Sequence, residues 1–182
     1  MKRYDIAQVL QFWFSELPPA QWFAKSDELD AQITKRFGGM LQAAAAGELW
    51  HWRHNSSGRL AEIIVLDQFS RNVYRDTPQA FAQDPMALVL AQEAVAAGCD
   101  ATLNAAEKAF LYMPYMHSES VIIHEQAVEL FNKPGLETNY EFELKHKVII
   151  DHFGRYPHRN DILGRKSSAE EIEFLNQPGS SF

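Results

Sequence analysis

The sequence has little of what stabilises small secreted proteins or carries proteins across membranes. Of its 182 residues one is a cysteine, Cys99, which excludes an internal disulfide framework and a cysteine-based zinc site. No run of about 18 apolar residues occurs, which predicts that no helix spans a membrane. No apolar signal-peptide core follows the first residues, so we expect a cytoplasmic protein. The net charge of −7 disfavours nucleic acid as the main partner, because backbone binding requires a basic surface.

The composition is that of an ordinary globular protein, with 46% hydrophobic and 23% charged residues. At about 150 residues per domain, the length predicts one domain over residues 1–182. Residues 76–143 hold two Lys/Arg against eleven Asp/Glu, a net of −9, which we interpret as a solvated acidic face. If the segments on either side of this stretch pack together, their arginines form a local positive site: Arg71, Arg75, Arg155, Arg159 and Arg165.

Capping and breaking residues divide the first half of the chain into helices. Asp5 and Ser26 are suited to cap the first two helices, and Pro18 and Gly47 are placed to end them. Residues 59–75 follow a polar break at 56–58 and are apolar nearly all round, which predicts a central buried helix. A further helix is expected over residues 86–97, opened by the pair Asp84-Pro85, in which Asp84 is the cap.

The second half follows the same pattern. Capping boxes are predicted where Asn104 precedes Glu107, where Thr138 precedes Glu141, and where Ser168 precedes Glu171. Met113-Pro114 predicts a helix break, with a new helix from about residue 115 to residue 132. No strand-like alternation competes with these patterns. The sequence therefore predicts an all-α protein of seven to nine helices, whose short connections favour antiparallel hairpins.

Polar residues interrupt the apolar stripes of three predicted helices. His146 lies inside the stripe of residues 139–153, Glu119 inside that of the helix after Pro114, and Asp67 with Arg71 on the central helix. Burying a charge is costly unless it is paired and hydrogen-bonded. These interruptions indicate that the three helices converge on one polar site.

Each of these residues also has a purely structural interpretation. Asp67 and Arg71 lie four residues apart and can pair on their own helix. His146 alone is typical of a satisfied core histidine. Glu119 is equally suited to pair with an arginine from another helix. These alternatives stay open at the level of the sequence.

The segment 152–160 concentrates two histidines, two arginines and an asparagine after a helix stop. Gly154 supplies a turn and Pro157 restrains the backbone, so the loop can hold arginine forks for a carboxylate or a phosphate. Its histidines are suited to proton transfer near neutral pH. The alternative is a cationic cluster that caps helix ends.

Metal and cofactor sites have weaker support. His117, His146, His152 and His158, with Asp67 or Glu119, are suitable metal-ligand types, but no metal-binding spacing such as HExxH occurs. His117 and Glu119 lie two apart on a predicted helix and would not face one point. The sequence also lacks a dinucleotide-binding glycine motif, a phosphate-binding loop and a GxSxG motif. We therefore expect neither a resident metal nor a cofactor.

Three motifs stand out in the chain: Leu66–Pro78, Phe110–Pro114 with His117-Ser118-Glu119, and Phe153–Asn160. Through these motifs, and over nearly its whole length, the chain resembles the bacterial domain-of-unknown-function family 924. Ser70 stands where the family usually has proline, and Tyr156 where it usually has phenylalanine, which adds a hydroxyl near the expected site. The resemblance implies a tetratricopeptide-like helical superhelix and no particular reaction. Its motifs fall on the polar residues that interrupt the helical pattern.

Two hypotheses of function follow, with a ligand-free ion network as a third interpretation. In the first, the protein binds a small anionic molecule, with His117, His146 or His158 as acid or base, oriented by Asp67 or Glu119. In the second, it is a peptide-binding or scaffold module that clamps a peptide carboxylate, as helix-repeat proteins often do. The residues expected to bind the ligand are Arg71, Arg75, Arg155, Arg159 and Asn160.

Overall fold

The computed structural model describes residues 4–182, and within them every regular element is helical and none is a strand. The all-α prediction is therefore confirmed, and the labels α1 to α9 fall within the predicted number. The helices are α1 (Ile6–Gln11), α2 (Asp27–Ala45), α3 (Ser56–Ile64), α4 (Ser70–Val73), α5 (Asp84–Ala96), α6 (Ala105–Met116), α7 (Val121–Phe131), α8 (Glu137–Phe153) and α9 (Ala169–Leu175). None of these helices is long and apolar enough to cross a membrane.

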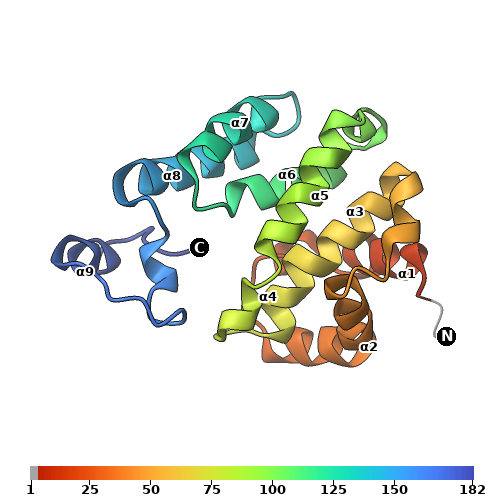
Figure 1. Cartoon of the computed structure of the whole chain (residues 1–182), viewed down its shortest axis with the longest axis horizontal. Helices are drawn as coiled ribbons and strands as arrows, with labels where there is room; N and C mark the ends of the chain where they lie inside the picture. The colour runs from red at the N-terminus through yellow and green to blue at the C-terminus, as the bar shows by residue number, and fades with distance from the viewer. Residues whose placement is uncertain (1–3) are drawn as a thin grey trace.

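A central rod runs through the middle of the molecule (Figure 1). It consists of α3, a π-helical turn over Val65–Phe69, and α4, in unbroken succession. Its residues 60–70 are all buried, as the apolar composition predicts. Helices α1, α2, α5 and α6 pack around it, so polar groups on the rod lie at the centre of the fold.

The remaining helices extend from one side of this core. Helix α6 packs on α7 and α7 on α8, and α9 contacts the short helical turn Pro157–Arg159. Figure 1 shows the segment after α8 returning toward the end of α4. This successive packing agrees with hairpin pairing of neighbours, while the tetratricopeptide-like superhelix remains a prediction.

Four predicted caps are confirmed. Asp5 accepts a hydrogen bond from the backbone of Ala7, and Ser26 accepts one from Leu29. The capping boxes at Asn104 and at Ser168 are both formed. Each satisfies backbone N–H groups that have no partner inside the helix.

Other predicted boundaries are wrong. The central helix begins at Ser56 rather than after residue 58, because Asn55 provides the cap. Thr138 forms no capping box, because α8 already begins at Glu137. Asp84 is the first residue of α5 and caps nothing, because its carboxylate bonds arginines instead.

The predicted break at Pro114 is also wrong, and this error matters for the site. Pro114 lies inside α6, which ends at Met116. A proline this close to a helix end disturbs only the last turn. The next helix begins at Val121, so His117 and Glu119 lie in a four-residue linker rather than on one helix. The helical-spacing argument against their acting at one place therefore does not apply.

Candidate functional site

The centre of the candidate site is a hydrogen bond between Asp67 and His117. Asp67 lies in the π turn of the central rod with 1% of its surface exposed. Its Oδ1 accepts a hydrogen bond from His117 Nδ1 over 2.7 Å, and its Oδ2 accepts one from Gln68 Nε2 over 2.6 Å. A π turn inside an α-helix is rare and is frequently found at functional sites. Here it places a carboxylate within reach of the linker between α6 and α7.

The protonation of this pair follows from its surroundings. Burial alone would raise the pKa of the Asp67 carboxyl, but His117 and Arg71 lower that pKa to about 2. Burial and the charge of Arg71 also hold the pKa of His117 below its usual value, although Asp67 opposes them. At neutral pH Asp67 is therefore ionised and His117 is neutral. Because a carboxylate only accepts hydrogen bonds, Nδ1 carries the proton and Nε2 presents a lone pair.

Two arginines share a second carboxylate, that of Asp84. Arg71 Nη1 and Nη2 donate to its two oxygens over 2.8 and 3.0 Å, and Nη1 also donates to the Asp67 backbone oxygen over 2.8 Å. Arg159 reaches Asp84 with Nη1 over 3.4 Å and donates from Nη2 to the His117 backbone oxygen over 3.1 Å. Arg71 is thus fully paired by a fork, whereas Arg159 has one long contact with a carboxylate.

Arg159 is the least satisfied cation of the group. It is 6% exposed, and its buried Nε has no hydrogen-bond partner among residues 4–182. Its guanidinium lies 4.6 Å from the ring centroids of both Phe81 and Tyr156. Burial, and then the charge of Arg71, lower the pKa of this guanidinium. We call Asp67, Arg71, Asp84, His117 and Arg159 the central cluster.

Glu119 and Asn160 support the loop that carries Arg159. Glu119 receives a fork from Arg165 over 2.7 and 2.9 Å and a hydrogen bond from the Tyr156 backbone over 2.8 Å. Asn160 accepts a hydrogen bond from Arg165 Nε and donates to Ser167. Glu119 therefore pairs with an arginine and does not orient a histidine, in agreement with the structural interpretation of the sequence.

His146 and His158 lie beside the central cluster, and both pack against the Tyr156 ring. His146 donates from Nδ1 to the Phe142 backbone oxygen over 2.7 Å, and burial lowers its pKa to about 3. The Nδ1 of His158 is buried without a partner in the described chain. Burial and Arg159 lower the pKa of His158 to about 4. Both histidines are neutral at neutral pH.

The structure does not bring Arg75 and Arg155 to the central cluster. Arg75 donates hydrogen bonds from Nε and Nη2 to the Asp30 carboxylate, which links the segment after α4 to α2. Arg155 donates hydrogen bonds from Nε and Nη2 to the Glu171 carboxylate over 2.6 and 2.8 Å, which links the loop to α9. Both guanidinium groups are engaged at these places by carboxylates of neighbouring helices.

Two comparisons with known proteins place the chain in a family. Residues 9–179 match the family described as bacterial protein of unknown function, DUF924. The chain belongs to the DUF924 family. A solved structure, a protein of unknown function named ATU0120 from Agrobacterium tumefaciens, is 34% identical over 94% of this chain and 96% of its own, with a TM-score of 0.89. No curated protein matches the chain.

The two departures from the usual DUF924 pattern have simple structural outcomes. The Ser70 hydroxyl is buried and has no partner in the described chain, so a residue without that hydroxyl would lose no hydrogen bond there. The Tyr156 hydroxyl donates to the Met116 backbone oxygen and lies 3.2 Å from His124 Nε2. The added hydroxyl therefore joins the loop to the end of α6.

Sequence reasoning missed a buried pair and one central carboxylate of this DUF924 protein. His124 Nδ1 lies 2.6 Å from Glu143 Oε1, and both side chains are fully buried between α7 and α8. Neither residue is among the polar residues that interrupt the predicted apolar stripes. The pair Asp84-Pro85 predicts a cap at Asp84, because Asp-Pro is typical of a helix start. Its contact with Arg159 spans 75 residues, which no local pattern reveals.

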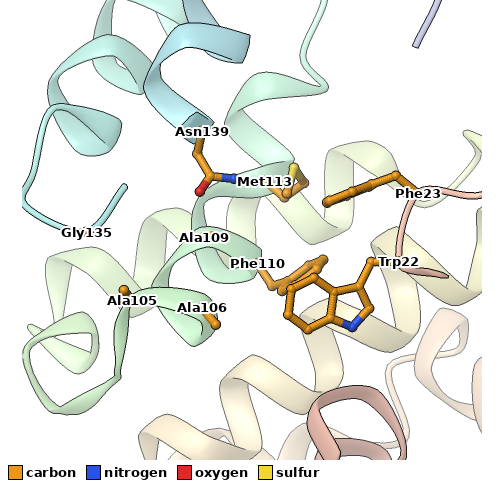
Figure 2. A pocket seen from close by; sticks show the side chains of 9 residues that line it. All are labelled: Trp22, Phe23, Ala105, Ala106, Ala109, Phe110, Met113, Gly135 and Asn139. Atoms are coloured by element: carbon orange, nitrogen blue, oxygen red, sulfur yellow. The ribbon is translucent and has the colours of Figure 1, made fainter. Parts of the chain in front are cut away.

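Two hollows of the surface lie away from the central cluster. The first, of about 330 Å³, is lined by Trp22, Phe23, Phe110, Met113 and their neighbours on α6 (Figure 2). The second, of about 280 Å³, lies between α8 and α9. Within residues 4–182 no group of three His, Cys, Asp or Glu side chains is arranged to hold a metal ion.

Proposed function

We propose that this DUF924 protein binds a small anionic molecule, a carboxylate or a phosphate, at the central cluster. The observation that carries the proposal is the state of Arg159. Its guanidinium is buried, its Nε is unpaired, and its one carboxylate contact is long. A buried charge is costly unless it is paired, and an anion at Nε would supply the missing acceptor.

The formal charges of the central cluster balance, but its two cations are not paired equally. Arg71 and Arg159 face Asp67 and Asp84, and His117 is neutral. Asp84 is committed to the Arg71 fork, so its attraction for Arg159 is shared. A ligand carboxylate or phosphate bound to Arg159 would therefore pair a cation that the protein pairs only weakly.

His117 adds a second requirement for the ligand. Asp67 holds the proton on Nδ1, so Nε2 accepts hydrogen bonds and does not donate them. An anion that also carries a hydroxyl, such as a hydroxy acid or a singly protonated phosphate, satisfies Arg159 and His117 together. In this proposal His117 is the acid–base residue and Asp67 is its orienting partner.

A thermal-shift screen against inorganic phosphate, acetate, lactate and citrate tests the proposal. A ligand at about 100 times its Kd stabilises the folded protein by about 2.7 kcal/mol. For a chain of this length that raises Tm by roughly 5–11 °C. We expect Arg159→Gln to abolish the shift, because it removes the unpaired cation.

Arg155→Gln is the matched control. Arg155 lies in the same loop and forks a carboxylate on α9, so its variant keeps the central cluster and should keep the shift. Arg159→Gln should itself fold, because Asp84 retains its fork from Arg71. A flat screen with the natural sequence, or a shift that survives in Arg159→Gln, would overturn the proposal.

A further inference from the structure

The ring of Phe182 covers the histidine next to the central cluster. It stacks on the His146 imidazole with 3.8 Å between ring centroids and 25° between planes. It also lies edge-on to His158, at 6.3 Å and 72°. Phe182 is 51% exposed while His146 is 6% exposed. The phenyl ring therefore shields a buried imidazole and leaves its own other side to solvent.

Two of the three aromatic rings at this place contact Phe182, and the third supports them. His146 and His158 contact the Phe182 ring, and Tyr156 packs against both histidines, with 5.7 Å to the His146 centroid and 5.5 Å to that of His158. Tyr156 is fixed by its bond to the Met116 backbone, and His146 by its bond to the Phe142 backbone. We call His146, Tyr156 and His158 the aromatic platform.

The aromatic platform adjoins the cation on which the proposed function depends. The Arg159 guanidinium lies 4.6 Å from the Tyr156 ring centroid, and residue 158 precedes it directly in the chain. The unpaired Nδ1 of His158 adds a buried polar group at the same place. A ligand that carries an anionic group on a planar ring therefore fits this arrangement. Its ring would lie on the aromatic platform and its anionic group beside Arg159.

The segment that carries Phe182 is attached weakly. Ser180 donates to the Leu175 backbone oxygen over 3.1 Å. Beyond it, within the described chain, the backbone of residues 181–182 makes no hydrogen bond. Figure 1 shows these last residues running back from α9 toward the segment after α8. The stacking of one half-exposed ring is thus the main contact that holds Phe182 in place.

We propose that the aromatic platform is a subsite for the ring of an aromatic anion, and that Phe182 occupies this subsite as an internal competitor. The inference rests on the proposed function, because it assigns the anionic group of the same ligand to Arg159. Flat rings stack favourably in offset and edge-to-face arrangements, and the platform offers both to a ring that replaces Phe182. The ligand class is therefore an aryl phosphate or an aryl carboxylate.

Isothermal titration of phenyl phosphate and inorganic phosphate into the natural protein and Phe182→Ala tests the inference. If Phe182 occupies the subsite about nine-tenths of the time, only about a tenth of the molecules accept the ligand ring, and removing the competitor strengthens binding about tenfold. We expect that gain for phenyl phosphate and a change of less than twofold for inorganic phosphate. Phe23→Ala is the control, because Phe23 is also exposed and stacks on Phe110 away from the site.

The outcomes separate the two proposals. If neither phosphate compound binds to either protein, the proposed function fails and the inference fails with it. If both bind and Phe182→Ala brings no preferential gain for phenyl phosphate, the subsite is refuted while the anion site stands. If Phe182→Ala weakens both compounds equally, Phe182 supports the site and does not occupy it, which also overturns the inference. A thermal melt of each variant confirms that it is folded.

Discussion

Replacing Asp67 with asparagine removes the buried carboxylate that His117 and Arg71 share. In the folded protein its pKa falls from 3.8 to about 2. By linkage, a shift of that size corresponds to about 2 kcal/mol of stability at pH 7. Arg71 keeps its fork with Asp84, so the variant leaves no unpaired arginine. We therefore expect a loss near 2 kcal/mol rather than the 3–5 kcal/mol that follows when a buried charge is orphaned.

Urea unfolding followed by tryptophan fluorescence measures this loss directly. The control is Asp151→Asn, because Asp151 pairs with Lys147 at the surface and such pairs contribute at most about 1 kcal/mol. A destabilisation by Asp67→Asn of less than about 0.5 kcal/mol would refute the account of Asp67 as an ionised, hydrogen-bonded carboxylate.

The pH dependence gives the same prediction a second test. The pKa of Asp67 is lower in the folded protein than in the unfolded chain. The contribution of Asp67 to folding stability is therefore complete above pH 3.8 and is lost as the pH falls toward about 2. The difference in the free energy of unfolding between the natural protein and Asp67→Asn should be constant from pH 7 to pH 5 and should shrink in more acidic solution. A difference that grows with acidity would contradict the reasoning.

Three further predictions concern the packing of the rod, a glycine of α2, and the contact of α7 with α8. Gly58→Ala should destabilise by more than about 3 kcal/mol in urea unfolding, since a Cβ at Gly58 would lie 2.0 Å from the Trp52 backbone oxygen. Gly38→Ala, in open space inside α2, should instead stabilise by about 0.5–1 kcal/mol. Glu143→Gln should cost less than about 1.5 kcal/mol at pH 7, because burial raises the pKa of Glu143 and an amide can still donate to His124. A loss above about 3 kcal/mol in the same assay would show that this pair requires the negative charge.

Much of the fold could be predicted because its signals are local. The caps at Asp5, Ser26, Asn104 and Ser168 depend on side chains two or three residues from the groups they satisfy. The buried central rod follows from its own apolar composition. The break at Pro114 failed because the cost of a proline depends on its distance from the helix end, which the sequence pattern left open.

The candidate site was predicted in part for a related reason. Asp67, Arg71, His117 and Arg159 were singled out as polar residues in apolar or stiffened surroundings, and the structure brings these four together. Arg75, Arg155, Glu119 and Asn160 carry the same chemistry, yet they meet other partners. Residue type and spacing do not distinguish these two sets, because each contains two arginines and one carboxylate.

The sequence by itself determined the all-α class, the starts of α1, α2, α6 and α9, and the burial of the central rod, because these depend on neighbours within one or two turns. Only the tertiary structure decided which charges meet. The contacts of Asp67 with His117, of Asp84 with Arg159 and of Phe182 with His146 span 50, 75 and 36 residues. Such contacts arise from the packing of whole helices and loops, so the unpaired Nε of Arg159 became visible only in the folded chain.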